Sequence, residues 1–443
     1  MGSTTTKPLR RIAFLNPHSD PLGTIGEPDC GGQCIVEEKL MHWITRIDPE
    51  IRVESYTRRH SGKPREEKIG ERATVHRIPC AGEGFIRKED LYGHLPEFKE
   101  NTLKLWQEKG YHYDILHGHY ADGGAVALML SEQLGIPYLF TAHSLGKVKQ
   151  QSLPDGPTGS TFHYHERIPW EQRVIDDAHR IIALNEIERN DYYQGLYKAA
   201  PEKVRVIPNA VDLGQFPFPP AGEKSRPPNE RIVFTTGRLD DRKGFPLLAG
   251  TLEKAASDLE EQGLRARYRF PGGGSRLTGE EHCVLDAIKN AVPAAFRDRL
   301  EFFPRLGFPE LVRAYQQADV FVCASPYEPF GLVILEAMAV GTPAVAGAGS
   351  GGPPEIIADG VDGVLADLHD TADFADKLVR LLGDDETRRR MGENARRKVE
   401  ERYSWASVAE TTLNLYREVN AKAGLCPITR QKRAKKRSLH GSK

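Results

Sequence analysis

The amino-acid sequence predicts an α/β protein of two lobes, each built on a doubly wound parallel sheet, facing each other across a cleft. Three observations predict this class. Short apolar, β-branched runs alternate with longer amphipathic segments along the chain, which is typical of a parallel sheet wrapped by helices. Each half repeats the same plan of strand, loop and helix. The 443 residues exceed one ordinary hydrophobic core, so two domains are expected.

The strand pattern recurs in both halves, and a linker divides them. In the first half the strand segments are RIAFLNP (11–17), ATVHRIP (73–79), DILHGHY (114–120), PYLFTAHS (137–144), RIIALN (180–185) and VRVIPNAV (204–211). In the second half they are RIVFTTGR (231–238), ARYRFPGG (266–273), LEFFPRL (300–306), DVFVCAS (319–325) and PAVAGAG (343–349). The stretch between them, residues 212–230, is rich in Pro, Gly and charge, as linkers are.

These segments predict four regions of the chain. We expect an N-terminal domain over residues 1–212 and a C-terminal domain over residues 213–400. A helix over residues 401–425 is expected to cross back to the N-terminal domain. Residues 426–443 include the basic run RQKRAKKR and are expected to form a disordered tail. A nucleic-acid arm or a localisation signal is the alternative for this run.

Composition excludes several classes of protein. Lys and Arg total 61 and Asp and Glu total 62, a formal net charge of −1. General nucleic-acid binding is therefore not expected, and an anionic ligand needs local cations. No apolar run is long enough to span a bilayer, so no integral membrane contact is expected. Six cysteines without metal-ligand spacing favour a reducing cytoplasm.

Polar clusters recur where the expected strands end. FLNPHSD, GHY, TAHSLG, GRLDDRKG and SPYEPFG each follow a strand segment. In open parallel sheets, ligands bind beyond the carboxyl ends of the strands, where loops lead into helix N-termini. Structural roles can explain one or two such clusters, but they do not explain a polar cluster after nearly every strand segment. We therefore expect these loops to form the functional site.

Two loops have residues suited to phosphate groups. Gly31, Gly32 and Gln33 precede an amphipathic segment, and glycines before a helix let the backbone N–H groups approach a phosphate. The alternative is an ordinary turn. The loop GRLDDRKG places Arg238 and Lys243 five residues apart, and these side chains can hold phosphate oxygens. The alternative is a solvated loop in which the neighbouring aspartates pair with the basic residues.

Three further basic residues are candidates in the first lobe. His143 ends a strand segment in TAHSLG, where a ligand role and a structural role are equally expected. Lys88 lies in FIRKEDLYGHL and Arg167 in FHYHERIPW, where a phosphorylated acceptor could be held. Ordinary surface loops also have such residues. The histidines near Arg167 do not have the H-E-x-x-H spacing of a zinc site, so no metal is expected.

The stretch SPYEPFGLVILEAM contains two glutamates, eight residues apart. Glu328 precedes a Pro-Phe-Gly turn, and Glu336 lies inside an otherwise apolar helix. A buried carboxylate costs several kcal/mol unless it is hydrogen-bonded, so Glu336 needs donors. The vicinal hydroxyl groups of a sugar can supply them. The alternative is an internal salt bridge, which needs a cation that this segment does not contain.

The segment from Glu328 to Pro343, E-P-F-G-L-x-x-x-E-A-M-A-x-G-T-P, resembles the signature of retaining nucleotide-sugar glycosyltransferases of family 4. D-x-G-G-Q, T-A-H-S-L-G, I-P-N-A-V-D, G-R-L-D-D-R-K-G and S-G-G-P-P-E-I-I-A-D-G-V-D-G are also similar to motifs of this family, and the resemblance covers nearly the whole chain. It implies the GT-B fold of two Rossmann-like domains, with acceptor binding by residues 1–212 and nucleotide-sugar binding by residues 213–400. G-G-Q, F-I-x-K-E-[DE]-L and H-S-L-G are further similar to sucrose-phosphate synthases and mannosylfructose-phosphate synthases.

The resemblance implies roles for individual residues. Those implied in catalysis are His143, Arg238, Lys243 and Glu328; those implied in donor binding are Gly32, Gln33, Phe330, Gly331, Leu332 and Glu336; those implied in acceptor binding are Lys88 and Arg167. In this scheme Arg238 and Lys243 hold the diphosphate and Glu336 accepts from the ribose hydroxyls. Glu328 holds the hydroxyls of the donor hexose, and His143 lies beside that hexose.

The resemblance implies a retaining hexosyltransferase that uses UDP-glucose as donor and fructose 6-phosphate as acceptor. No cofactor is expected to be required, since two basic side chains can replace Mg²⁺, which then remains an optional stimulant. The alternatives are a mannosylfructose-phosphate synthase that uses GDP-mannose, a lipid or cell-wall glycosyltransferase of the same fold, and an inactive GT-B binding protein. The donor base, the hexose, the acceptor and the oligomeric state stay open.

Overall fold

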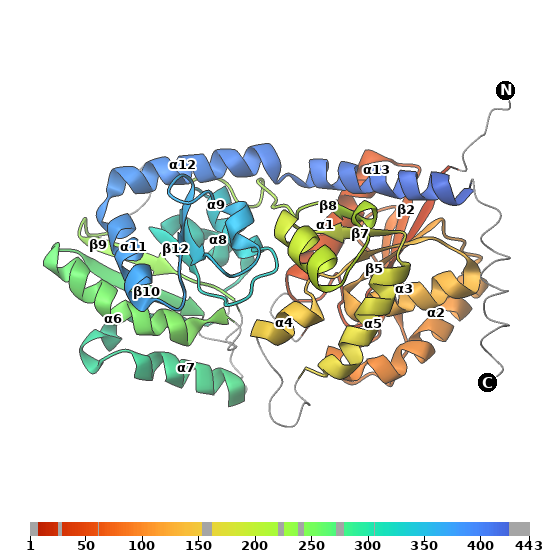
Figure 1. The fold of residues 1–443 in the computed structure, drawn as a ribbon, viewed down its shortest axis with the longest axis horizontal. Coiled ribbons are helices and arrows are strands. Elements are labelled where there is room, and N and C mark those ends of the chain that lie inside the picture. Colours follow the sequence, from red (N-terminus) through yellow and green to blue (C-terminus); the bar gives the residue numbers. More distant parts are fainter. Residues whose placement is uncertain are drawn as a thin grey trace. The chain divides into compact units, whose positions relative to one another are not determined.

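The structure is a computed structural model that describes residues 8–24, 29–60, 62–152, 162–219, 226–237, 243–271, 279–304 and 306–424. The chain forms two compact units (Figure 1). Unit 1 comprises Met1–Ala183, Arg189–Ile207 and Ala406–Lys443, and unit 2 comprises Leu184–Glu188 and Pro208–Trp405. The C-terminal helix α13 (Trp405–Gly424) thus belongs to unit 1 from its second residue.

Unit 1 contains one sheet in the order β3-β4-β2-β1-β5-β6-β7-β8. Its strands are β1 (Arg11–Leu15), β2 (Arg52–Arg58), β3 (Glu66–Lys68), β4 (Ala73–Ile78), β5 (Ile115–His119), β6 (Tyr138–Thr141), β7 (Arg180–Ala183) and β8 (Val204–Val206). Its main helices are α1 (Gly32–Ile47), α2 (Leu95–Lys109), α3 (Tyr120–Leu134), α4 (Gly146–Ser152), α5 (Tyr164–Asp177) and most of α13. All strand pairs are parallel except β3 with β4. The strand order reverses between β1 and β5, which is the position where ligands bind in such sheets.

Three glycines bring α3 close to this reversal point. A Cβ atom at Gly123 would lie 2.0 Å from the carbonyl oxygen of Leu15, at the end of β1. A Cβ atom at Gly118 on β5 would lie 2.7 Å from the Cα atom of Gly124. Only glycine permits this approach, and it places the first turn of α3 directly beside the loop that follows β1.

Unit 2 contains a six-stranded parallel sheet in the order β11-β10-β9-β12-β13-β14. Its strands are β9 (Glu230–Phe234), β10 (Arg265–Pro271), β11 (Leu300–Phe303), β12 (Val320–Cys323), β13 (Ala344–Gly347) and β14 (Gly363–Ala366). Its helices are α6 (Phe245–Glu261), α7 (Gly279–Ala291), α8 (Phe308–Gln317), α9 (Leu332–Ala339), α10 (Pro353–Ile356), α11 (Thr371–Gly383) and α12 (Asp385–Arg402). Here the strand order reverses between β9 and β12.

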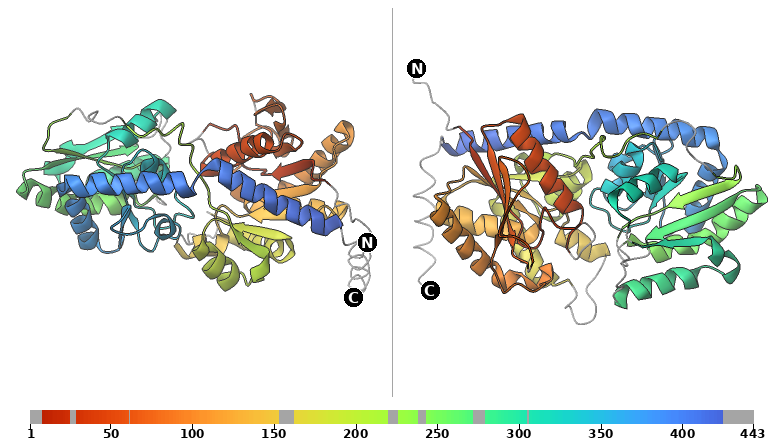
Figure 2. Two further views of the ribbon diagram at one scale, coloured as in Figure 1. Left: turned by 90° about the horizontal axis from the view of Figure 1, so that it is seen from above. Right: turned by 180° about the vertical axis from the view of Figure 1, so that it is seen from behind.

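Both faces of the unit 2 sheet are covered. On β9, Val233 packs into a core with α6 and α11, whereas Ile232 and Phe234 pack into a second core with α8 and α9. Alternate side chains of a strand point to opposite faces, so each face has its own apolar core. Within each unit, the ribbon views show helices on either side of the sheet (Figure 2). Among the described residues, no helix combines the length and the apolar character needed to cross a bilayer.

Three strands, β2, β3 and β14, were not predicted from the sequence. In β2 every residue from Val53 to Arg58 is buried, although the sequence RVESYTR is largely polar. Several of its polar groups are bonded inside the fold: Ser55 donates to Asn16 Oδ1 at 3.2 Å, and Arg58 donates to the carbonyl oxygens of Cys80 and Gly82. Internal hydrogen bonds make such a strand tolerable, but its composition does not reveal it.

Candidate functional site

In unit 2, two loops at the carboxyl edge of the sheet pack tightly together. The N–H group of Glu328 donates to the carbonyl of Ser350 at 2.8 Å, and the carbonyl of Glu328 accepts from Gly352 N–H at 2.8 Å. A Cβ atom at Gly352 would lie 2.5 Å from the carbonyl oxygen of Phe330. Gly331, with φ of 109°, then starts α9. The loop after β12 is thereby fixed by the loop after β13.

This arrangement places a basic and an acidic side chain together. Lys243 Nζ donates to Glu328 Oε2 at 3.0 Å, and both side chains are partly exposed. A Cβ atom at Gly244, which follows Lys243, would lie 1.9 Å from the carbonyl oxygen of Ala324, so the start of α6 lies directly against the end of β12. Arg238, expected beside Lys243, lies outside the described residues. The same holds for the aspartates 240 and 241.

Glu336 lies in α9, where Tyr315 of α8 donates a hydrogen bond to its Oε2 at 2.7 Å. Burial raises the pKa of Glu336 to about 7, against which the tyrosine hydrogen bond acts. The hydrogen-bond donor to Glu336 is thus a neutral hydroxyl group and not the cation of an internal salt bridge. Phe330 is 4% exposed and packs 6.2 Å from Tyr403 between ring centroids, so its side chain belongs to the core.

In unit 1, Gly31 caps α1, and the exposed Gly32 and the partly buried Gln33 form its first turn. The Nε2 group of Gln33 donates to Oε1 of Glu37 at 2.8 Å. The Nδ2 group of Asn16, in the loop after β1, donates to the other oxygen of Glu37. The sequence reasoning did not select Glu37. Its position on the apolar face of α1, between Val36 and Leu40, was the signal that could have identified it.

Three histidines lie on or just after strands β5 and β6: His117 and His119 belong to β5, and His143 follows β6. We call these residues the histidine cluster. His119 Nδ1 and His143 Nε2 share a hydrogen bond of 2.9 Å, and their rings stack with centroids 5.2 Å apart. The His117 and His119 rings lie 4.0 Å apart. His143 has a φ of 55°, in the left-handed region. The helix α13 also contributes, since Tyr416 and His117 Nδ1 share a hydrogen bond of 2.6 Å.

Burial keeps the histidine cluster neutral. It lowers the pKa of His117 and of His143 to about 3, and it lowers that of His119 well below the usual value. At neutral pH each imidazole therefore offers one N–H donor and one lone pair. His143 can donate to or accept from a sugar hydroxyl, but it cannot provide a positive charge.

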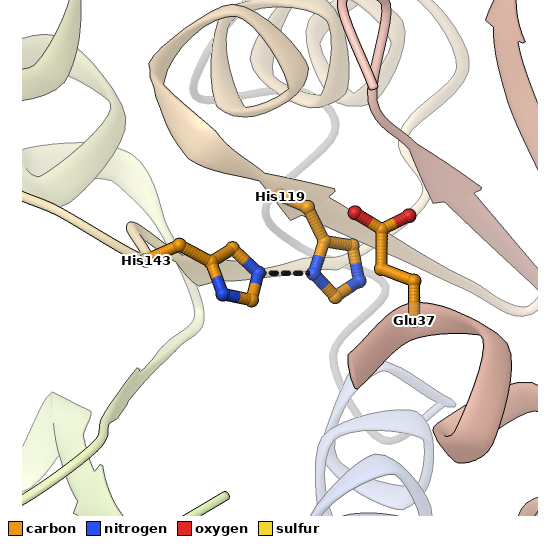
Figure 3. A group of neighbouring side chains, drawn as sticks. All are labelled: Glu37, His119 and His143. Carbon is orange, nitrogen blue, oxygen red and sulfur yellow. Dashed lines mark hydrogen bonds between the residues drawn. The ribbon is translucent and has the colours of Figure 1, made fainter. Parts of the chain in front are cut away.

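Glu37, His119 and His143 each have a potential ligand atom within 4.8 Å of the other two, and His119 lies between its neighbours (Figure 3). Metal binding would need these lone pairs to point at one centre. The nitrogens of His119 and His143 instead face each other in a hydrogen bond, and both oxygens of Glu37 accept from amides. We therefore assign no metal to this group, and the expected absence of a metal stays a prediction.

The two residues expected to bind the acceptor also lie in unit 1. Arg167 on α5 is 2% exposed, and its Nε donates to Glu171 at 2.7 Å. Its Nη1 donates to the Tyr120 hydroxyl at 2.6 Å, and its Nη2 donates to the carbonyl oxygen of Ser144 at 2.6 Å and to Ser144 Oγ at 3.1 Å. Arg167 is thus held inside the fold and not on a surface loop. The clusters GHY and TAHSLG include Tyr120, which begins α3, and Ser144, which follows His143, but no individual role was predicted for either residue.

Lys88 begins a short 3₁₀ helix, Lys88–Asp90, and its Nζ forms an ion pair with Asp29. Its backbone N–H also donates to Asp29 Oδ2 at 3.3 Å. Asp29 lies two residues before Gly31. The ion pair therefore links the Lys88 segment to the loop that begins α1.

Comparison with known proteins extends over almost all of the chain. The family model described as Glycosyltransferase Family 4 matches residues 47–215, and that described as Glycosyl transferases group 1 matches residues 221–398. The D-inositol 3-phosphate glycosyltransferase of Saccharomonospora viridis is 33% identical over 420 residues, covering 93% of this chain and 95% of that protein. The mannosylfructose-phosphate synthase of Agrobacterium fabrum is 29% identical over 428 residues, covering 93% of this chain and 92% of that protein.

The solved structures agree with this assignment. The sucrose-phosphate synthase of Thermosynechococcus elongatus superposes with a TM-score of 0.82 at 27% identity, covering 93% of this chain and 100% of that one. Its likeness spans both parallel sheets and the helices around them, and the relatives that match over the full length are named glycosyltransferases and synthases. The chain therefore belongs to glycosyltransferase family 4, has the GT-B fold and is a hexosyltransferase.

Proposed function

We propose that this enzyme transfers a hexose from a nucleotide sugar to a hydroxyl group of a phosphorylated polyol with retention of configuration, with UDP-glucose and fructose 6-phosphate as the first choice of substrates. One observation carries the proposal. Lys243 and Glu328 lie in contact at the carboxyl edge of the unit 2 sheet, beside the helix that holds Glu336. A cation and two carboxylates at this edge suit a sugar diphosphate, whose phosphates need positive charge and whose hydroxyls need acceptors.

The donor roles follow from the charges. Lys243, with Arg238, neutralises the charge that develops on the β-phosphate as the leaving group departs. Glu336 accepts hydrogen bonds from the ribose hydroxyls. Burial on α9 raises the pKa of its carboxyl group, so further hydrogen-bond donors would stabilise the carboxylate. Glu328 accepts from hexose hydroxyls, and its pairing with Lys243 keeps the carboxylate beside the phosphates.

We propose a front-face reaction. The bond between the anomeric carbon and the phosphate oxygen breaks as the bond from that carbon to the acceptor oxygen forms on the same face. The proton of the acceptor hydroxyl passes to the departing β-phosphate, so no protein nucleophile is required. Isolation of a covalent glycosyl-enzyme would contradict this scheme.

For the acceptor, we propose that Arg167 and Lys88 hold its phosphate group. The terminal nitrogens of Arg167 donate to the Tyr120 hydroxyl and to the carbonyl and hydroxyl oxygens of Ser144, while Glu171 holds its Nε. A guanidinium with hydroxyl groups at its tip can bind a phosphate through several charge-assisted hydrogen bonds. Departure of one hydroxyl from Arg167 would free the donor for a phosphate oxygen.

A second acceptor, inositol 3-phosphate, is favoured by the 33% identity to a D-inositol 3-phosphate glycosyltransferase over nearly the whole chain. The test is a panel of UDP-, GDP- and ADP-hexoses, each with fructose 6-phosphate or inositol 3-phosphate, followed by thermal shift and by product analysis. Matching substrates should raise the melting temperature by mass action and yield a product phosphate ester. Product from neither acceptor, with liposome binding instead, would favour a lipid glycosyltransferase. No hydrolysis of any nucleotide sugar would favour an inactive binding protein.

A further inference from the structure

Glu37 is a fully buried acid that contacts three elements of unit 1. It lies on α1, and it accepts hydrogen bonds from Gln33 of the same helix and from Asn16 of the loop after β1. The orientation of Asn16 is fixed independently, because Ser55 of β2 donates to its Oδ1 at 3.2 Å. Both oxygens of Glu37 thus accept a hydrogen bond from a side-chain amide.

The third neighbour of Glu37 is His119, at the end of β5. In the described part of the chain, His119 Nε2 is buried without a hydrogen-bond partner, while its Nδ1 is bonded to His143. An unpaired buried polar atom costs about 1–3 kcal/mol. Figure 3 shows the Glu37 carboxyl group on the side of His119 that is turned away from His143. A ligand atom of Glu37 and one of His119 lie within 4.8 Å of each other, and a shift of the Glu37 side chain would bring the two groups into a hydrogen bond.

We propose that Glu37 is a positioning residue that carries a proton and donates it in a hydrogen bond to His119 Nε2. It thereby fixes the direction of each hydrogen bond in the chain that runs from His119 through His143 to the substrate. His119 then holds its own hydrogen on Nδ1 and donates it to His143 Nε2. Neutral His143 in turn has its hydrogen on Nδ1, the remaining ring nitrogen. His143 therefore presents a donor, and not a lone pair, to the sugar oxygen. This last step alone rests on the proposed function.

The surroundings of Glu37 support the protonated form. Burial, and then the negative charges of Asp122 on α3 and Asp20 in the loop after β1, raise the pKa of Glu37 well above its usual range, against the hydrogen bonds from Gln33 and Asn16. Asp122 is paired with His18, and Asp20 is paired with Arg77 and Lys63. The thiol of Cys34 and the hydroxyl of Tyr416 are two further titratable groups near Glu37, beside His119 and His143.

The ionised form predicts the opposite arrangement. A carboxylate at Glu37 would accept from His119 Nε2–H, so His119 Nδ1 would accept from His143 Nε2–H. His143 would then present a lone pair on Nδ1. Because the two arrangements place hydrogens on different ring nitrogens, they can be distinguished in the unliganded protein without any assay of the reaction.

The first test is ¹⁵N nuclear magnetic resonance of the full chain with ¹⁵N-labelled histidine, assigned by difference from a His119→Gln variant. At pH 7 we expect His119 to have its hydrogen on Nδ1, and to change to Nε2 when pH rises through the pKa of Glu37. Glu37→Gln keeps an N–H donor for His119 Nε2 and should hold the Nδ1–H form at all pH values. An Nε2–H form of wild-type His119 at pH 7 would overturn the proposal.

The second test uses kcat/KM as a function of pH, taken as the ratio of its alkaline value to its value at pH 7. In the wild type, kcat/KM should be about tenfold lower at alkaline pH than at pH 7, which is the cost of one mismatched hydrogen bond. In Glu37→Gln the fall should be absent. The matched control is Glu38→Gln, the next residue of α1, which pairs with Lys39 on the surface and should keep the wild-type fall. An equal fall in Glu37→Gln and the wild type would contradict the proposal even if the reaction itself were confirmed.

Discussion

Lys243 Nζ lies 3.0 Å from Glu328 Oε2, and a substitution of Lys243 tests whether this residue has a role in catalysis. If Lys243 stabilises the departing diphosphate, Lys243→Ala should lower kcat by roughly 100- to 1000-fold, the effect of losing one charge-stabilising donor. We expect a similar loss for Arg238→Ala. The measurement is steady-state kinetics at saturating donor.

Lys254→Ala is the control for Lys243→Ala, since Lys254 on α6 pairs with Asp258 and Asp376 at the surface. It should leave kcat near the wild-type value. A Lys243→Ala variant with unchanged kcat and a raised KM alone would show that Lys243 binds the donor equally in the ground state and the transition state.

Glu336 gives a prediction for stability as a function of pH. Its pKa in the folded protein is about 7, above the ordinary value of 4.5, so the folded state binds this proton more tightly than the unfolded state does. The group therefore destabilises the fold increasingly as pH rises from 4.5 to 7, and by a constant amount above that. Glu336→Gln removes this contribution. Its melting temperature relative to the wild type should increase over that interval.

Scans of the melting temperature at pH 5 and pH 8 measure this difference for Glu336→Gln. Glu310→Gln, an exposed residue of α8, is the control and should show no such trend. A constant difference between Glu336→Gln and the wild type at both pH values would show that the pKa of Glu336 is not raised.

The site residues differ in how far the sequence could predict them. The apolar helix around Glu336 correctly indicated that the carboxyl group needs a donor. The donor Tyr315 could not be predicted, because it lies on a separate helix and only tertiary packing brings it to 2.7 Å. A surface loop was the alternative to acceptor binding for Arg167. Its burial could have been predicted, since Glu171 follows it by one helical turn and can neutralise it.

At the scale of elements, apolar runs predicted the strands on which the site is built, β1, β5 and β6 in unit 1 and β9, β12 and β13 in unit 2. Polar composition concealed β2, whose charged and hydroxyl side chains are bonded internally. The four-residue β14 follows the turn-rich segment D-G-V-D-G and is too short to show a pattern. Periodicity thus detects strands that have apolar side chains on both faces, and it misses strands with internal polar networks.

Close packing of α3 on β1 gives a prediction for an element. In Gly123→Ala the new methyl group would lie 2.0 Å from the Leu15 carbonyl oxygen, so α3 must move away from β1. Overpacking of this kind costs about 1–3 kcal/mol. We expect a lower melting temperature, and a loss of activity because the loop after β1 and the start of α3 shift together.

Gly250→Ala is the contrasting variant for Gly123→Ala. Gly250 lies in the interior of α6, and a Cβ atom there would meet nothing within 4 Å. Since alanine is favoured over glycine in helices by about 1 kcal/mol, this variant should be at least as stable as the wild type. Equal stability of the two variants would show that the contact at Gly123 relaxes without cost.

At the scale of the whole molecule, the two units are not contiguous in sequence. Unit 1 needs residues from Ala406 onward, which supply Tyr416 to His117 and Glu418 to Arg180. A fragment that ends at the linker therefore lacks one helix of unit 1. The sequence placed the linker at residues 213–230, and the structure divides the main chain at Pro208. A helix over 401–425 was expected, and α13 extends over Trp405–Gly424.

This division gives a prediction about fragments. Residues 208–405 contain the whole six-stranded sheet, both of its apolar cores apart from Leu184, and the side chains of Lys243, Glu328 and Glu336. We expect this fragment to fold alone and to bind UDP, as measured by circular dichroism and isothermal titration calorimetry. The fragment 1–207 should fold only when residues 406–424 are supplied, because the buried His117 otherwise loses its Tyr416 partner.

A different result would contradict the prediction for each fragment, because the two fragments test different properties. A folded 208–405 fragment without affinity for UDP, beside a full chain that binds UDP, would show that unit 2 does not hold the nucleotide by itself. A stable 1–207 fragment would show that α13 adds little to unit 1. In that case the hydrogen bond from Tyr416 to His117 would have to act on the histidine cluster only, and Tyr416→Phe should then change activity without lowering the melting temperature.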